Sequence, residues 1–99
     1  ADTLKLTRKQ ADSLANSGKI TEAIALGESK LPQMAEDSVK SRLLFDLGLW
    51  YGWQEKRDLS SAYYEKALLL EEKLPRPRTE LLGLIYNNLA FNSTAANQN

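Results

Sequence analysis

Hydrophobic residues recur at three- and four-residue steps along most of the chain, which is the spacing that places them on one face of an α-helix. No stretch alternates with a period of two over enough residues to predict a strand. The pattern therefore predicts an all-α fold in which short connections make consecutive helices pack as antiparallel hairpins. The predicted helices cover residues 3–16, 21–31, 38–55, 58 or 60 to 74, and 79–92, and residues 93–99 are predicted to be a polar tail.

Helix boundaries follow from residues that end or cap helices. Gly18 tolerates the left-handed conformation at a helix end, and Pro32 cannot easily continue a helix. The segment 75–78, Pro-Arg-Pro-Arg, breaks the fourth helix, and we expect Arg76 and Arg78 to be solvated there. The predicted N-caps are Asp37 or Ser38, Asp58 or Ser60, and Thr79.

The residues on the apolar face of each predicted helix are expected to form the core. Small residues on these faces, Ala23, Gly48, Ala62 and Ala90, are expected to let neighbouring helices approach closely. The larger residues expected to point inward are Leu14, Ile20, Ile24, Leu31, Leu43, Leu44, Leu47, Trp50, Tyr51, Leu59, Tyr63, Leu70, Leu74, Leu81, Leu82, Ile85 and Leu89.

Three segments recur in order along the chain, which indicates an internal repeat. The second copy's return helix is about one turn longer than the first, and this explains why the offsets differ. The matches pair 28–32 with 71–75 (43 residues later), 46–48 with 88–90 (42 residues later), and 18–23 with 57–62 (39 residues later).

These residues resemble the tetratricopeptide repeat (TPR), in a long-helix variant because the usual period is 34. Leu47, Gly48 and Tyr51 fit its first helix, and Gly18, Ile20 and Ala23 fit its turn and second helix in copy one. Asp58, Leu59 and Ala62 fit the same stretch in copy two, and residues 86–90 open a third copy. The resemblance implies one domain, 1–99, built as a right-handed solenoid. Its parts are repeat one (3–31), repeat two (38–74) and the first helix of a third repeat (79–92).

The alignment of the two copies has two solutions. The preferred one pairs Ala23 with Ala62 and needs two extra residues in the preceding helix. The ungapped alternative puts Tyr64 and Ala67 on the family's aromatic and alanine positions, and it loses the turn match at residues 58–59.

In the TPR family, ligands lie in the concave groove lined by the first helix of each hairpin. The corresponding groove candidates are Lys5, Arg8, Asp12, Arg42, Phe45, Leu49, Trp53, Leu84, Asn87 and Phe91. Cations beside aromatic and apolar groups suit a peptide with an acidic or carboxylate group.

Competing interpretations remain open for several of these residues. Lys5, Arg8 and Arg42 are also explained as solvated surface charges, and Phe45 and Trp53 as core. Asp12 lies four residues from Arg8 and is spaced to pair with it. The family's full carboxylate clamp is absent, because Asp12 and Leu49 occupy positions where that clamp uses Asn.

The amino-acid composition argues against several classes of function. The chain of 99 residues has 13 Lys and Arg against 13 Asp and Glu, and neither His nor Cys. It therefore lacks a thiol nucleophile, a thiolate zinc site and the usual general base, so we expect no enzyme, no metal and no cofactor. Zero formal charge argues against a nucleic-acid partner, and no apolar run approaches the ~20 residues that span a bilayer.

The sequence thus predicts a protein- or peptide-binding scaffold without catalysis. The alternatives are a ligand-sensing or dimerising regulatory segment of a longer signalling protein, such as a bacterial one, and an engineered or truncated repeat scaffold. A lone fifth helix leaves apolar surface uncovered, which suggests homodimerisation through that helix. A soluble chain is expected, cytoplasmic, or exported if Ala1 is a mature end.

Overall fold

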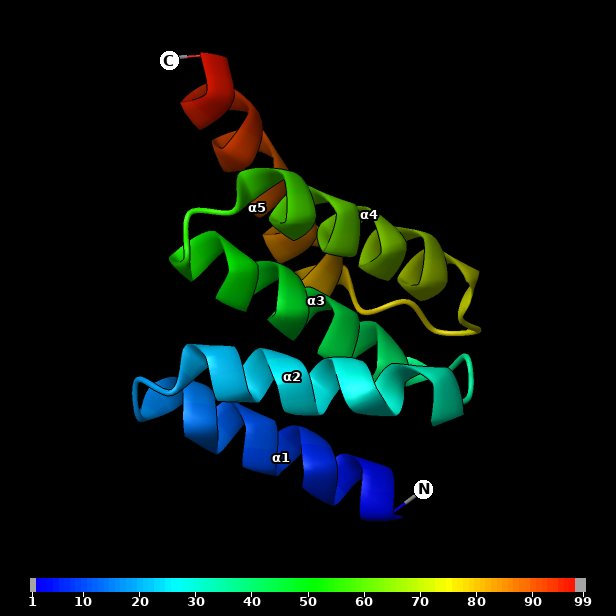
Figure 1. Ribbon diagram of the computed structural model, residues 1–99. Coiled ribbons are helices and arrows are strands. Elements are labelled where there is room, and N and C mark those ends of the chain that lie inside the picture. Colours follow the sequence, from blue (N-terminus) through cyan, green and yellow to red (C-terminus); the bar gives the residue numbers. More distant parts are fainter. Residues whose placement is uncertain (1, 98–99) are drawn as a thin grey trace.

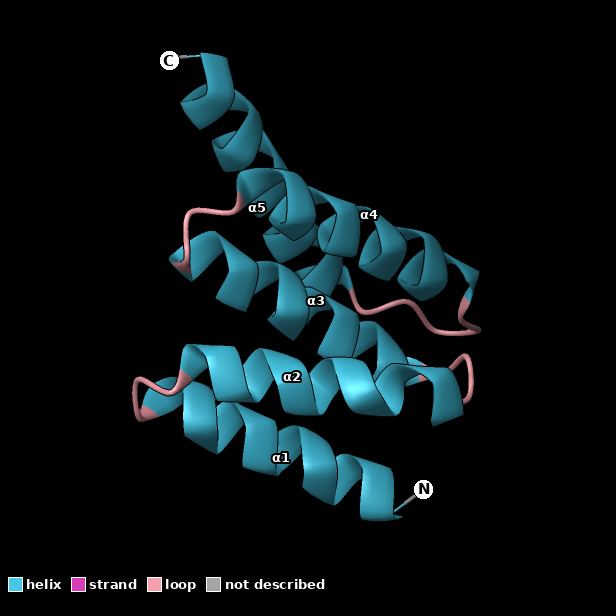
Figure 2. Ribbon diagram, viewed as in Figure 1, coloured by secondary structure: helices cyan, strands magenta, loops and turns pink. Residues whose placement is uncertain are grey.

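The computed structural model describes the backbone of residues 2–97 and the side chains of residues 8–95. The described part is all-helical, without strands, as predicted (Figure 2). The elements are α1 (Asp2–Asn16), α2 (Ile20–Lys30), the short 3₁₀ turn η1 (Leu31–Gln33), α3 (Ser38–Trp53), α4 (Arg57–Lys73) and α5 (Thr79–Asn97).

Most predicted boundaries lie within a few residues of the observed ones. The Asp37 carboxylate accepts hydrogen bonds from the backbone N–H groups of Val39 and Lys40, which confirms it as the N-cap of α3. The predicted caps of α4 are wrong, because α4 begins after Lys56 without a side-chain cap. The predicted polar tail is also wrong in part, since α5 continues to Asn97.

The five α-helices follow one another from α1 at one end to α4 and α5 at the other (Figure 1). The α1–α2 and α3–α4 pairs are hairpins, and α3 also packs on α2. One hydrophobic cluster joins α1, α2 and α3 around Trp50, and another joins α3, α4 and α5 around Tyr64 and Ile85. Helix α3 therefore contributes to both cores, which explains why half of its residues are buried.

The two hairpins turn in the same way. Gly18 after α1 and Glu55 after α3 both have positive φ, +85° and 60°. In each turn the next residue's N–H, that of Lys19 or Lys56, donates to the carbonyl five residues back. Each turn therefore closes the helix end with the hydrogen bond of a Schellman motif. Gly18 is thus the structural counterpart of Glu55, 37 residues later, and not of Arg57.

This correspondence corrects the preferred alignment of the repeats. The same offset pairs Ala23 with Ser60, and both are fully buried, whereas Ala62 is exposed. Tyr64 and Ala67 point into the core, as the ungapped alternative requires. Leu59, predicted to point inward, is about half exposed because it belongs to the register that fails.

Only some of the small residues bring helices together. A Cβ on Gly48 would lie 2.6 Å from the Tyr64 ring, so α3 and α4 approach too closely there for any side chain. The hydroxyl of Ser60 donates to the Gly48 carbonyl at 2.6 Å across the same contact. Ala62 and Ala90 are exposed, so the expectation that they mediate close helix approach is wrong.

Two carboxylates, one on α2 and one on α4, tie helices together. The Glu28 carboxylate on α2 accepts hydrogen bonds from the Tyr51 and Tyr63 hydroxyls, at 2.8 and 2.6 Å, and the two rings stack. Burial and these hydrogen bonds raise the pKa of Tyr51 to about 12. Glu71 on α4 accepts a hydrogen bond from the Ser41 hydroxyl on α3 at 2.8 Å, although the 37-residue offset pairs Glu28 with the exposed Glu65 and not with Glu71.

Candidate functional site

The cations predicted to line a groove meet over a carboxylate that sequence reasoning missed. Arg8 from α1 and Arg42 from α3 both pair with Asp46, at 3.6 Å and 3.3 Å. Arg8 therefore forms its ion pair with Asp46 and not with Asp12 as its spacing suggested. The side chain of Lys5, the third predicted cation, lies outside the described residues.

Asp46 is 2% exposed, and its Oδ2 has no hydrogen-bond partner. Burial raises the pKa of its carboxyl group, and the charges of Arg8 and Arg42 oppose that shift. Asp46 lies beneath both guanidinium groups and holds one side of each. The Arg8 side chain stays 25% exposed and the Arg42 side chain 42% exposed.

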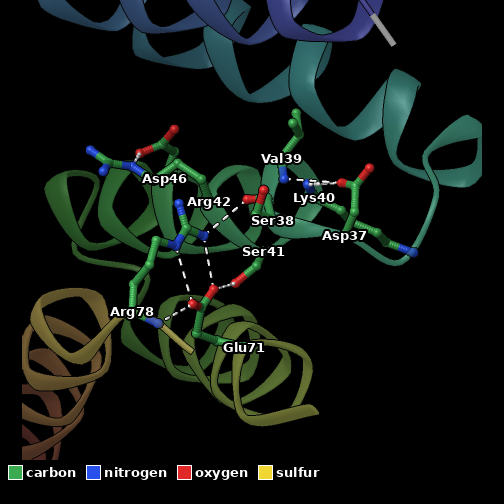
Figure 3. A network of polar contacts seen from close by, with 9 residues as sticks. All are labelled: Asp37, Ser38, Val39, Lys40, Ser41, Arg42, Asp46, Glu71 and Arg78. Atoms are coloured by element: carbon green, nitrogen blue, oxygen red, sulfur yellow. Dashed lines mark hydrogen bonds and ion pairs between the residues drawn. The ribbon is translucent and has the colours of Figure 1, made fainter. Parts of the chain in front are cut away.

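A second arginine network lies next to the first (Figure 3). The Arg78 guanidinium donates to both oxygens of Glu71, at 2.8 and 3.1 Å, and to the Ser38 carbonyl at 3.0 Å. The backbone N–H of Arg78 and the Ser41 hydroxyl also donate to Glu71. Arg78 is therefore not a freely solvated loop residue, and the expectation that it is solvated is wrong.

These hydrogen bonds change the acidity of Glu71, which is fully buried. Hydrogen bonds from Arg78 lower the pKa of its carboxyl group to about 2, against the opposing effect of burial. Glu71 is thus ionised at neutral pH, and it holds the α4–α5 connection against α3.

Two neighbouring cavities lie over these networks. One, of about 310 Å³, is lined by Arg8, Lys9, Ser38, Val39, Arg42 and Arg78. The other, of about 370 Å³, is lined by Arg42, Arg78, Thr79, Glu80, Leu81 and Leu84. Because Arg42 and Arg78 line both, the two cavities adjoin, and we call them together the arginine groove. The predicted residues Arg8, Arg42 and Leu84 belong to it, and Lys9 and Arg78 are additions.

The other predicted groove residues do not line these cavities. Phe45 is 4% exposed beneath Arg42, so its assignment to the groove surface is wrong and the core interpretation holds. Asp12 and Leu49 are half-buried, and Asn87 is exposed. The large aromatic side chains Trp53 and Phe91 are exposed by about half or more.

Phe91 nevertheless has a cationic neighbour. The Arg57 guanidinium at the start of α4 lies 5.6 Å from the centre of its ring, a cation–π distance.

The described residues hold no cluster of acidic side chains arranged for a metal ion. Within that part of the chain, every helix is too short or too polar to cross a bilayer. Comparison with family models, with curated proteins and with solved structures finds no match.

Proposed function

We propose that this chain is a TPR-like protein-binding scaffold that holds an acidic peptide segment in the arginine groove. In this proposal the helical hairpins form a short right-handed solenoid, and α1, α3 and α5 are its groove helices. Binding is docking onto a preformed surface, without covalent chemistry or a cofactor.

The observation that carries the proposal is the distribution of charge around the groove. The first cavity is lined by Arg8, Lys9, Arg42 and Arg78. The carboxylates that pair with the three arginines, those of Asp46 and Glu71, are buried beneath the surface. In the first cavity a ligand therefore meets the exposed sides of the cations and not the acids that balance them, whereas the wall of the second cavity also carries the exposed carboxylate of Glu80.

The second cavity adds an apolar contact. Leu84 is about half exposed in its wall, beside the shared arginines. A carboxylate held by Arg42 would thus lie within reach of a site for an apolar side chain. Guanidinium groups recognise carboxylates through paired hydrogen bonds, so an acidic residue next to an apolar one is the preferred ligand pattern.

Fluorescence anisotropy with a short peptide of alternating glutamate and leucine, ending in a free carboxylate, tests the proposal. Arg42→Glu should weaken its binding about tenfold or more, because an attraction becomes a repulsion inside the groove. Arg76→Glu makes the same charge change in an exposed loop position outside the groove and serves as the matched control. Trp53→Ala tests whether the aromatic end of α3 extends the site.

The proposal fails if the acidic peptide does not bind. It also fails if a lysine–leucine peptide binds equally well, or if Arg42→Glu and Arg76→Glu weaken binding by the same factor.

An alternative function is a dimerising regulatory segment that associates through α5. The large apolar side chains of Leu84, Tyr86 and Phe91 on that helix are each about half exposed or more. Their exposure favours an interaction of α5 with another chain. A Tyr86→Ser variant separates the two functions, because it should abolish association through α5 and leave peptide binding in the groove intact.

A further inference from the structure

The outer ridge of α4, which runs along Ala62 and Leu69, is exposed in the described chain. The face of α4 that packs inward carries Ser60, Tyr64, Ala67 and Glu71, all buried. Leu69 lies on the opposite side of the helix and is 60% exposed. It is therefore a large aliphatic side chain on the exposed face of α4.

The two flanks of this ridge carry opposite charge. At 3.6 residues per turn, Lys66 and Lys73 lie roughly 60° and 40° to one side of Leu69. Glu65 and Glu72 lie roughly 40° and 60° to the other side. All four are exposed, and none forms an ion pair within the described part of the chain. We call these pairs the lysine flank and the glutamate flank.

A cavity of about 440 Å³ opens beside the lysine flank. Leu44 and Leu70 form its buried floor, and Leu31 and Leu69 contribute to its walls. The charge around it is mainly positive, since Lys40 on the far wall is paired with Glu36 while Lys66 and Lys73 are not paired with an acid. Lys66 instead lies over the Tyr63 ring, 5.3 Å from its centre. The complementary surface is apolar with carboxylates two helical turns apart.

That complementary surface is present on the same helix. Leu69 with the glutamate flank offers an apolar side chain and two carboxylates seven residues apart, the spacing of Lys66 and Lys73. We propose that the outer ridge of α4 binds the α4 ridge of a second copy of this chain.

The arrangement of charge selects the orientation of this pair. Two antiparallel ridges related by a two-fold axis would set lysine flank against lysine flank. Two parallel ridges, with the axis along the helices, set the lysine flank of each copy against the glutamate flank of the other. The dimer is therefore parallel, with Leu69 meeting its counterpart at the axis. This contact differs from association through α5 and leaves the arginine groove open.

Two variants in which both flanks of α4 carry the same charge test the proposed dimer. Lys66→Glu with Lys73→Glu makes both flanks acidic, and Glu65→Lys with Glu72→Lys makes both basic. In sedimentation equilibrium the natural chain should associate with rising concentration, and each variant alone should associate at least tenfold more weakly. An equimolar mixture of the two variants should associate again, because every flank then meets its opposite. Circular dichroism verifies that both variants remain helical.

The matched controls carry the same net charges at exposed positions near the hairpin turns. They are Lys19→Glu with Lys56→Glu, and Glu22→Lys with Glu55→Lys. Each control should self-associate like the natural chain. Added sodium chloride should weaken both the natural pair and the restored mixture, because exposed ion pairs are screened.

A single cysteine reports the orientation, since the chain has none of its own. Ala62 lies two turns before Leu69 on the same exposed ridge. In the parallel pair, Ala62→Cys faces its counterpart and should oxidise to a linked dimer.

Three results would overturn the proposal. They are a natural chain that stays monomeric at all concentrations, a variant mixture that associates no better than its parts, and control variants that behave like the flank variants. Efficient linking of Lys66→Cys with Lys73→Cys in preference to Ala62→Cys would overturn the parallel orientation, because only antiparallel ridges bring these two positions together.

Discussion

At the residue scale, the Glu71–Arg78 pair shows how a buried charge is retained. Glu71 has no exposed surface, yet it receives hydrogen bonds from Ser41, from the Arg78 side chain and from the Arg78 backbone. These donors replace the water that burial removed, so the carboxylate stays ionised. Sequence spacing did not reveal the pair, because Arg78 reaches back across a proline-containing loop whose course depends on the packed helices.

Removal of this carboxylate should be costly. Glu71→Ala leaves the buried Ser41 hydroxyl without its acceptor, whereas the Arg78 guanidinium, 41% exposed, regains water, and we expect a loss of about 1–3 kcal/mol in the free energy of unfolding. Chemical denaturation monitored by circular dichroism measures it. Glu72→Ala, at the adjacent exposed position, should change stability by no more than about 0.5 kcal/mol. Equal losses in the two variants would show that the network does not stabilise the fold.

The same network predicts an acid dependence of stability. The pKa of Glu71 is about 2 in the folded chain, below its ordinary value of 4.5. The unfolded chain therefore binds the proton first, and the stabilisation, present above pH 4.5, is lost as the pH falls toward 2. Asp46 has the opposite sign, because its raised pKa makes the folded chain bind the proton more readily.

Thermal unfolding at a series of pH values measures this dependence. Glu71→Gln, which cannot ionise, should flatten the curve between pH 4.5 and 2 relative to the natural chain. An unchanged slope would mean that other carboxylates dominate the acid transition.

At the element scale, the contact between α3 and α4 is set by one missing side chain. Gly48→Ala would place a Cβ 2.6 Å from the Tyr64 ring and 3.1 Å from the Ser60 carbonyl oxygen, which is backbone. We expect a loss of about 1–3 kcal/mol, because the two helices must move apart.

Gly83→Ala provides the control for helix propensity. Gly83 lies within α5, and a Cβ there would have no neighbour within 4 Å. This variant should gain roughly 0.5–1 kcal/mol, since alanine favours the helix. Denaturation curves of the two variants should shift in opposite directions, and shifts in the same direction would refute the close-contact explanation.

The helices themselves were predictable from the sequence because their apolar spacing is strong and Gly18, Pro32 and Asp37 punctuate it. The register between the copies was not. A search for alanine selected Ala62, while the equivalent buried position is held by Ser60, whose hydroxyl is satisfied by the Gly48 carbonyl. The turn residue is Glu55, and positive φ at a glutamate leaves no signal in the sequence comparable to glycine.

At the scale of the whole molecule, the arginine groove was only partly predictable. Arg8 and Arg42 were found because the resemblance to the TPR family implies that they line its groove. Asp46 was missed because its burial depends on α1 and α3 together, and Arg78 was missed because it arrives from a loop. Side chains that act within one helix follow from periodicity, whereas those that bridge helices require the packed structure.

The groove and the α4 ridge lie on opposite sides of α3, since Arg42 lines one and Leu44 the cavity beside the other. A dimer through α4 would therefore carry two open grooves. An acidic partner with two binding segments would then gain affinity from simultaneous attachment, provided that its linker spans the dimer.

The hydrogen bonds of the Glu28 carboxylate have a consequence for how the chain unfolds. It accepts phenol hydrogens from Tyr51 on α3 and Tyr63 on α4, so one side chain of the first hairpin is shared by both helices of the second. The hydrophobic clusters also meet there, since Tyr63 and Leu31 touch both. Repeat arrays often unfold unit by unit, but here opening either hairpin would break the hydrogen bonds to Glu28 and separate the contacts of Tyr63 and Leu31. We therefore expect the two hairpins to unfold as one cooperative unit, and α1–α2 by itself not to fold stably.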